Sequence, residues 1–236
     1  MTMTPGTLYL IPTLLDEAGL NVIPEYVQLI TNELSLFFVE NERTARRNLR
    51  KAGYLRSFDE TELHVLDKDT ESGQIIQYIH ILKGGKSAGV LSEAGVPCVA
   101  DPGSALVMAA HIHGIRVVPL VGPSSLLLAL MGSGMNGQKF AFQGYLPVAQ
   151  REREQALHRL EKLAIADRQT QIFIETPYRN QSMLQDILRV CQPTTLLGIA
   201  YGLTGPHEWV KTNPVAEWRK HVPKLEKIPA VFLLGV

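Results

Sequence analysis

Two short apolar runs in the middle of the chain, each followed by a loop rich in glycine and proline, constrain the fold most. The first run covers residues 87–91 and leads into the loop 92–103, and the second covers 115–121 and leads into 122–125. Short apolar runs bounded by glycine and proline and separated by a helical segment are typical of parallel strands in a βαβ unit. Open α/β sheets bind ligands at the carboxyl ends of their strands. We therefore expect the two loops to lie side by side and to form the functional site.

Alternating strand and helix patterns fill the rest of the chain. Strands are predicted at Thr7–Ile11, 34–39, 62–67, 140–143, 171–175, 195–201, 208–212 and 230–234. Helices are predicted at 24–33, 40–53, 72–83, 151–166, 179–191 and 214–221. The pattern changes from about Leu120, and the glycine-rich stretch 132–137 is typical of a hinge-like passage between two halves. The sequence therefore predicts an α/β fold with two domains, 1–119 and 120–236.

The composition excludes several classes of protein. The 236 residues include 23 lysines and arginines against 23 aspartates and glutamates, so any nucleic acid would have to be bound by a local basic patch. Cys98 and Cys191 are too few for a disulfide framework and lack the spacing of metal ligands, which favours a reducing cytoplasm. We expect no signal peptide, and no apolar stretch is long enough to span a membrane.

The densest basic run lies in the predicted helix 40–53. Arginines and a lysine recur there at spacings of three and four residues, so most of them share one helix face: Arg43, Arg46, Arg47, Arg50 and Lys51. One interpretation is a helix that contacts phosphates at the mouth of the site. The other is a solvated basic face whose later charges favour the helix C-terminus. The residues alone leave both interpretations open.

The loop sequences resemble those of a known family. Residues 92–103 read Ser-Glu-Ala-Gly-Val-Pro-Cys-Val-Ala-Asp-Pro-Gly, and 122–125 read Gly-Pro-Ser-Ser. Together they are similar to the paired cofactor loops of the tetrapyrrole methylase superfamily of S-adenosylmethionine-dependent methyltransferases. The branch of small-subunit ribosomal-RNA 2′-O-cytidine methyltransferases is the most similar. The likeness continues, in the same order, at 6–10, 142–147, 172–179 and 230–234.

The chain departs from the pattern of that branch at two places. Family members have a Pro-Ile-Gly-Asn-Leu-like turn after the first strand, whereas this chain keeps Pro12 and continues with bulkier residues to Gly19. They also have Glu-Asp-Thr-Arg at the start of the basic helix. This chain matches that motif at Glu40 and Arg43 but carries Asn41 in place of the aspartate.

The resemblance implies two α/β domains with a cleft for S-adenosylmethionine between them. No phosphate-cradling glycine motif is present, consistent with a cofactor that has no phosphate. The cofactor-binding residues that the resemblance implies are Pro12, Ser92, Glu93, Gly95, Asp101, Gly103, Ser124, Ser125, Phe142, Gly144, Pro229 and Ala230. Taken singly, Asp101 and the two serines are also compatible with simple helix capping.

A ribose hydroxyl that accepts a methyl group must lose its proton, and a carboxylate or a histidine is the usual base. Glu40, Glu93 and His64 are the catalytic candidates, and the sequence does not choose among them. A lone histidine in a strand is more often structural than catalytic. RNA-binding candidates are Arg43, Arg46, Arg47 and Arg50.

Three functions fit these observations. The first is an S-adenosylmethionine-dependent methyltransferase that acts on ribosomal RNA at a ribose 2′-oxygen. The second is methylation of a tetrapyrrole or another small molecule, and the third is a non-catalytic protein that binds S-adenosylmethionine. The resemblance also implies a homodimer, and we expect no metal and no membrane association.

Overall fold

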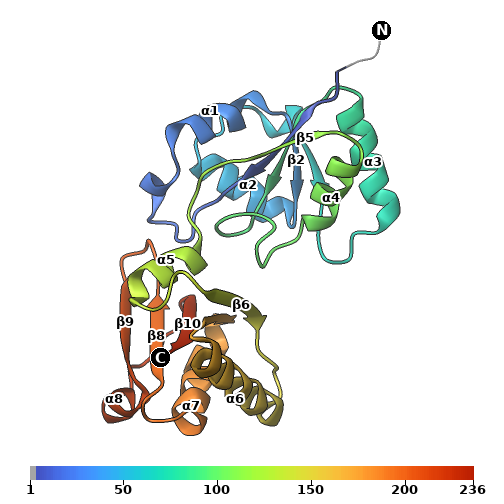
Figure 1. Ribbon diagram of the computed structural model, residues 1–236. Coiled ribbons are helices and arrows are strands. Elements are labelled where there is room, and N and C mark those ends of the chain that lie inside the picture. Colours follow the sequence, from blue (N-terminus) through green and yellow to red (C-terminus); the bar gives the residue numbers. More distant parts are fainter. Residues whose placement is uncertain (1–3) are drawn as a thin grey trace. The chain divides into compact units, whose positions relative to one another are not determined.

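The computed structural model describes residues 4–236 and divides into two compact units (Figure 1). The first unit extends to Ser124 and the second is Ser125–Val236. Each unit contains its own β-sheet with helices packed on it, so the predicted α/β class is confirmed. The sequence-based domain boundary at 119 lies a few residues before the end of the first unit.

The first unit is built on a parallel five-stranded sheet of order β3-β2-β4-β1-β5. Its strands are β1 (Thr7–Ile11), β2 (Leu36–Val39), β3 (Glu62–Val65), β4 (Ala88–Leu91) and β5 (Arg116–Pro119). Every residue of β2 and β4 is buried, which explains their unbroken apolar sequences. The edge strands β3 and β5 are exposed at both of their ends.

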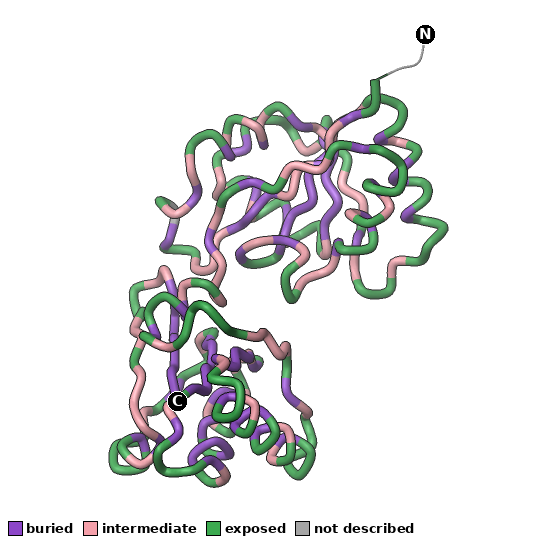
Figure 2. Tube along the Cα trace, in the orientation of Figure 1, coloured by how far each residue is buried: buried purple, intermediate pink, exposed green. Residues whose placement is uncertain are grey.

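Helices cover both faces of this sheet. They are α1 (Glu25–Glu33), α2 (Glu42–Lys51), α3 (Ser72–Lys83) and α4 (Ser104–Ile112), with short 3-10 turns at Leu20–Val22 and Phe58–Glu60. One apolar cluster joins the sheet to α3 and α4, and a second joins its other face to α1 and α2. Figure 2 shows the strands as purple, buried segments between helices that are partly exposed.

The strand order adds a third loop to the pair expected from the sequence. Strand β1 pairs with β4 on one side and with β5 on the other. The loop that follows β1 therefore comes between the loops after β4 and β5 in strand order, yet those two loops still approach each other, since a Cβ on Gly95 would lie 3.1 Å from the Pro123 carbonyl oxygen. The reason is that the chain leaving α4 adds its strand to the free edge of β1 and not to β4.

The second unit has a mixed sheet of order β6-β7-β10-β8-β9, in which only β6 and β7 pair in parallel. Its strands are β6 (Phe140–Tyr145), β7 (Thr170–Glu175), β8 (Leu196–Tyr201), β9 (Trp209–Pro214) and β10 (Ala230–Gly235). Its helices are α5 (Ser125–Ser133), α6 (Gln150–Asp167), α7 (Asn180–Val190) and α8 (Val215–Lys220), with a 3-10 turn at Pro177–Arg179.

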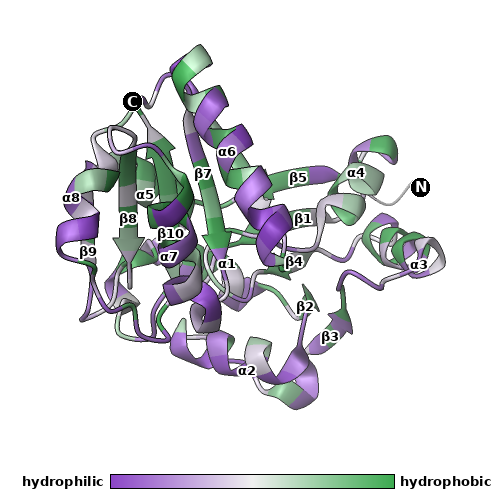
Figure 3. Ribbon diagram, turned by 90° about the horizontal axis from the view of Figure 1, so that it is seen from below, coloured by the Kyte–Doolittle hydropathy of each residue, from purple (hydrophilic) through white to green (hydrophobic). Residues whose placement is uncertain are grey.

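The core of this unit lies between the sheet and the helices α6, α7 and α8. Phe173 and Phe232 stack there with ring centroids 5.8 Å apart. Helix α5 packs on β8, β9 and β10, and Gly132 in it approaches Val210 so closely that a Cβ would lie 3.0 Å from that side chain. Figure 3 shows β7 and β8 mainly in green, whereas α6 carries both purple and green segments.

The glycine-rich stretch 132–137 is not the hinge that the sequence suggested, because it lies inside the second unit and is held by hydrogen bonds. The Asn136 side-chain amide donates to the Arg168 carbonyl (2.7 Å), and its oxygen accepts from the backbone N–H of Gln138 (2.9 Å). The Thr170 hydroxyl donates to the Asn136 carbonyl at 3.0 Å. Among residues 4–236, no helix is both long enough and apolar enough to cross a membrane.

Candidate functional site

Three loops meet at the carboxyl edge of the first sheet. The backbone N–H of Thr13, after β1, donates to the carbonyl of Gly95 in the β4 loop at 2.8 Å. A Cβ on Gly122, after β5, would lie 2.2 Å from the Cβ of Pro12, and one on Gly95 would lie 3.1 Å from the Pro123 carbonyl oxygen. The β1 loop is therefore clamped between the other two, and the close approach to Pro12 requires glycine at position 122.

The β4 loop has an unusual backbone. Four of its residues have positive φ angles: Gly95 (80°), Cys98 (67°), Ala100 (59°) and Gly103 (125°). Side-chain-bearing residues adopt this region at a cost of about 1–2 kcal/mol each, so Cys98 and Ala100 hold this shape only because their surroundings impose it. Gly103 is needed for a second reason, since a Cβ there would lie 2.8 Å from the Cys98 sulfur. Strain of this kind is concentrated at functional sites.

Carboxylates from three strands gather at this edge. Burial raises the pKa of Asp101, and the Glu93 charge raises it further, while a Ser92 hydrogen bond opposes the shift. Burial also raises the pKa of Glu40 at the end of β2, followed by the charges of Asp101, Glu93 and Asp67. The structure therefore brings Glu40, Glu93 and Asp101 together and adds Asp67, which follows β3 and which sequence reasoning did not select.

His64 lies opposite Phe38, two residues before Glu40 on the neighbouring strand. It sits within β3, where its ring packs against Tyr78 (centroids 5.5 Å apart) and Phe38 (6.1 Å), and its Nε2 is 3.8 Å from a Glu62 carboxylate oxygen. That nitrogen is buried and has no hydrogen-bond partner among the residues described. No described contact joins His64 to Glu40.

Helix α2 is tied to the β4 loop by a residue that sequence reasoning missed. The Asn48 side-chain amide donates to the backbone carbonyl of Glu93 at 3.1 Å. At the start of the helix, the Asn41 side chain accepts a hydrogen bond from the Thr44 N–H at 3.0 Å and so acts as the N-cap. Asn caps a helix as well as Asp does, so this departure from the family motif preserves the local structure. The only signal for Asn48 was a lone amide within a run of basic residues.

Two of the predicted RNA-binding arginines are engaged with Phe58. The Arg50 guanidinium lies 4.4 Å from the ring centroid and also donates to the Tyr54 carbonyl at 2.5 Å. Arg46 lies 5.6 Å from the same centroid and 3.4 Å from the Glu42 carboxylate. Both arginines remain exposed, but these contacts with Phe58, Tyr54 and Glu42 fix the positions of their side chains.

The positive charges of Arg47 and Lys51 on α2 are partly neutralised by the β1 loop. Glu17 in that loop lies 2.5 Å from the Lys51 ammonium and 3.9 Å from the Arg47 guanidinium. The hydrogen bond from Lys51 lowers the pKa of Glu17. Arg43, at the start of the helix, forms no ion pair within the part of the chain that the structure describes.

Five of the predicted cofactor residues belong to the second unit. Phe142 and Gly144 lie in β6 beside a shift in its register with β7, and Gly144 has a φ of 68°. Ala230 begins β10, and the exposed Pro229 before it accepts a hydrogen bond from the Gly202 N–H at 3.0 Å. Of the two predicted serines, Ser124 ends the first unit and Ser125 begins α5.

Comparison with known proteins identifies the family. The ribosomal RNA small subunit methyltransferase I of Xylella fastidiosa is 34% identical over 219 residues, which cover 93% of this chain and 76% of that protein. The chain belongs to the ribosomal RNA small subunit methyltransferase I family. The Pseudomonas aeruginosa member is 30% identical over 215 residues, covering 91% of this chain and 72% of that protein. No family model matches the chain.

Solved structures show that this family member has the tetrapyrrole methylase fold. The methyltransferase CobJ superposes with a TM-score of 0.62 at 21% identity, covering 98% of this chain and 94% of that one. Uroporphyrin III C-methyltransferase from Thermus thermophilus superposes with a TM-score of 0.58 at 17% identity, covering 98% and 97%. The family resemblance seen in the sequence is therefore confirmed.

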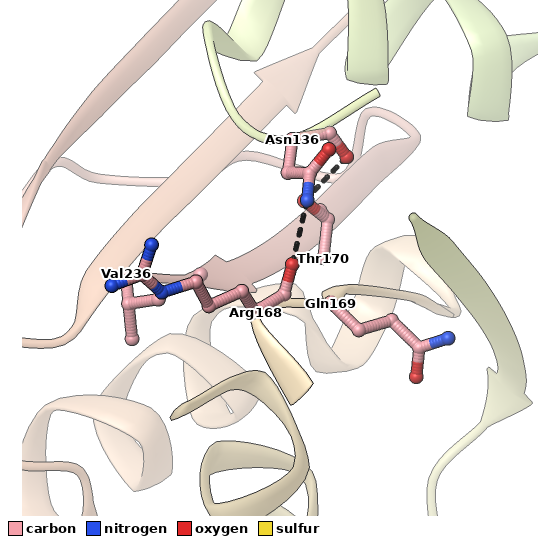
Figure 4. A pocket seen from close by; sticks show the side chains of 6 residues that line it. Asn136, Arg168, Gln169, Thr170 and Val236 are labelled. Carbon is pink, nitrogen blue, oxygen red and sulfur yellow. Dashed lines mark hydrogen bonds between the residues drawn. The ribbon is translucent and has the colours of Figure 1, made fainter. Parts of the chain in front are cut away.

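A pocket of about 390 Å³ in the second unit is lined by none of the predicted residues (Figure 4). It is lined by Asn136, Arg168, Gln169, Thr170, Gly235 and Val236. These residues lie before β6, at the start of β7 and at the end of β10, whereas Pro229 and Ala230 lie at the start of β10. Within residues 4–236, no three His, Cys, Asp or Glu side chains are grouped to hold a metal ion.

Proposed function

We propose that this protein transfers the methyl group of S-adenosylmethionine to a ribose 2′-hydroxyl of small-subunit ribosomal RNA. The observation that carries the proposal is the loop edge of the first unit, with its strained β4 loop and its carboxylates, in a chain that is 34% identical to a ribosomal RNA small subunit methyltransferase I. A uroporphyrin-III C-methyltransferase of the same fold, 17% identical, was solved with S-adenosyl homocysteine, the product of methyl donation.

The residues at this edge suit such a cofactor. Its sulfonium carries a positive charge. Burial and mutual repulsion destabilise the ionised carboxylates at this edge, and a nearby positive charge would stabilise them. Glu93 and Asp101 would provide that surrounding, and the backbone of Ser92, Gly95 and Gly103 would line it. Ser124 and Ser125, at the start of α5, are suited to receive the carboxylate of the methionine part.

When bound, S-adenosylmethionine would supply an electrophilic methyl group for in-line transfer to the acceptor oxygen, with S-adenosylhomocysteine as the leaving group. The protein must hold the acceptor in line and exclude water from the site. We assign the general base to Glu40, because its raised pKa makes its carboxylate a stronger proton acceptor at the edge where the loops meet. The hydroxyl proton would pass to that carboxylate. His64 is the weaker candidate, since it lies within β3 against Tyr78.

Helix α2 is the proposed RNA contact, with Arg43, Arg46, Arg47 and Arg50 on its exposed side. It follows β2 and is tied through Asn48 to the β4 loop, so a phosphate bound there would lie at the same edge. Phosphate binding releases counterions, and each contact removed should flatten the dependence of log affinity on log salt by about one unit.

The test measures methyl transfer from labelled S-adenosylmethionine to small ribosomal subunits, naked RNA and uroporphyrinogen III over a salt series. We expect transfer to subunits or RNA, with reduced activity and a flatter salt slope in Arg43→Ala and Arg47→Ala and nearly unchanged cofactor affinity. Arg159→Ala is the matched control, because Arg159 is an exposed arginine on α6. Equal activity and slope in all variants would remove α2 from the mechanism, and turnover of the tetrapyrrole alone would replace the proposed acceptor.

The assembled form is part of the same proposal. We expect a homodimer acting in the cytoplasm, where two unpaired cysteines remain reduced. The dimer rests on the family resemblance. Light scattering that gives the mass of a monomer at micromolar concentration would contradict it.

A further inference from the structure

Tyr178 is an aromatic side chain presented to solvent on a rigid turn. Its residue is 77% exposed, yet the turn that carries it is fixed by the buried carboxylate of Glu175. One oxygen of that carboxylate accepts from the Thr176 N–H at 2.7 Å and from the Arg179 guanidinium at 2.6 Å. The Arg179 N–H closes the turn on the Thr176 carbonyl at 2.9 Å. The turn therefore fixes the backbone of Tyr178 and leaves its ring exposed to solvent.

A cation from a second segment lies over this ring. The ammonium of Lys227 is 4.9 Å from the ring centroid. The backbone next to Lys227 is anchored as well, because the Ile228 carbonyl accepts a hydrogen bond from the fully buried Asn180 at 2.8 Å. Two separate segments, each fixed to the core of the unit, thus present an aromatic face and a positive charge together.

The strand register places this pair beside a predicted part of the cofactor site. Glu175, which ends β7, pairs directly with Ala230 at the start of β10. Tyr178 follows Glu175 by three residues, and Lys227 precedes Ala230 by three. The ring and the ammonium therefore lie at the end of the second sheet that carries Pro229 and Ala230.

We propose that Tyr178 and Lys227 form a docking point for one unpaired nucleotide of the RNA substrate. The open face of the tyrosine ring stacks on the base, and the ammonium binds a neighbouring phosphate. Proteins recognise single-stranded RNA by this combination of an aromatic platform and nearby positive charge. Isolated exposed aromatics are common on protein surfaces, but here the ring is held by a buried carboxylate and paired with a cation. The inference rests on the proposed function, because it requires an RNA substrate.

The experiment compares Tyr178→Ala, Tyr178→Phe and Lys227→Gln with the wild type. Fluorescence anisotropy measures the binding of a single-stranded RNA containing the methylated region and of a duplex of the same sequence. Kinetic assays give the KM for small ribosomal subunits, and calorimetry gives the affinity for S-adenosylmethionine. Loss of one stacked base should weaken single-strand binding by about 5- to 150-fold in Tyr178→Ala. Tyr178→Phe should stay within about twofold because it keeps the stacking ring. Lys227→Gln should flatten the salt slope by about one unit.

Phe140→Ala is the matched control, because Phe140 is a partly exposed aromatic residue (42%) at the opposite end of the same sheet. Wild-type affinity in Tyr178→Ala, while the wild type methylates RNA, would overturn this inference alone. An equal loss in Tyr178→Phe would assign the effect to the hydroxyl and not to stacking. An equal loss of cofactor affinity would assign the ring to the cofactor site. A wild type that neither binds nor methylates RNA would overturn the proposed function as well.

Discussion

The hydrogen bond from Asn48 to the Glu93 carbonyl offers a direct test of how the cofactor loop is held. Replacing Asn48 by alanine removes the 3.1 Å bond between α2 and the β4 loop and leaves the Thr13 to Gly95 bond in place. The β4 loop contains two non-glycine residues with positive φ, so it depends on its surroundings to keep its shape. Asn48→Ala should therefore weaken S-adenosylmethionine binding while leaving the fold intact.

The magnitude follows from the kind of bond. A hydrogen bond between neutral groups contributes about 0.5–1.5 kcal/mol, which corresponds to about 2- to 12-fold in affinity. The Asn48 bond is exposed, so water can replace part of it, and we expect the lower half of that range, about 2- to 5-fold. Isothermal titration calorimetry with S-adenosylmethionine measures it, and circular dichroism confirms that the variant is folded.

Asn41→Ala is the matched control for this experiment. It removes another side-chain hydrogen bond of α2, the N-cap to Thr44, and does not touch Glu93. If α2 acts through the Asn48 bond, Asn41→Ala should destabilise the helix by about 1 kcal/mol and leave cofactor affinity unchanged. Wild-type affinity in a folded Asn48→Ala, or equal weakening in both variants, would refute the reasoning.

Three further predictions address the site and the core. Gly122→Ala should weaken S-adenosylmethionine binding in calorimetry, because the added Cβ would lie 2.2 Å from the Pro12 Cβ and push the loops apart; a wild-type affinity would contradict the clamp. In the wild type, the Arg153 Nε donates to the Asp186 carboxylate at 2.6 Å. Asp186→Ala leaves that guanidinium buried without a carboxylate partner, so the free energy of unfolding measured in urea should fall by about 3–5 kcal/mol. Arg189→Ala, which removes an exposed partner of the same aspartate, should cost much less. The raised pKa of Asp101 means that ionisation of this carboxyl opposes folding. The free energy of unfolding of the wild type should therefore fall as pH rises from the usual aspartate value of 3.8 through the folded-state pKa. Asp101→Asn should therefore melt at a higher temperature than the wild type at pH 7, with the difference vanishing near pH 3.5, and an equal melting temperature at pH 7 would contradict the burial of that charge.

The elements of the fold could be predicted from the sequence because local patterns determine them. The buried strands β2 and β4 are continuous apolar runs, and α2 ends before Gly53, whose φ of 83° suits a helix stop. Strand order could not be predicted in this way. Whether β5 joins β4 or β1 depends on pairing between distant segments, and the loop sequences are the same in either case.

The site was predicted where motifs are contiguous and was incomplete where contacts are long-range. The loop carrying Glu93 and Asp101 is one continuous motif, whereas Asp67 and Asn48 reach the same edge from other elements. The stretch 132–137 was misinterpreted because glycine indicates a permissive backbone and not a mobile one. The hydrogen bonds of Asn136 fix that stretch, and no local sequence pattern predicts these bonds.

The position of β1 between β4 and β5 also determines the order in which the first unit can be completed during synthesis. Leu8 pairs with Ala88 and Thr7 with Arg116, so β1 leaves the ribosome well before its two partner strands are made. Such long loops must close before their pairings contribute, which makes folding of this topology slow. The loop edge needs β1, β4 and β5 at once. A nascent chain therefore gains this edge only after residue 119 has emerged, and until then β1 exposes unpaired edges that a chaperone or a neighbouring chain can occupy.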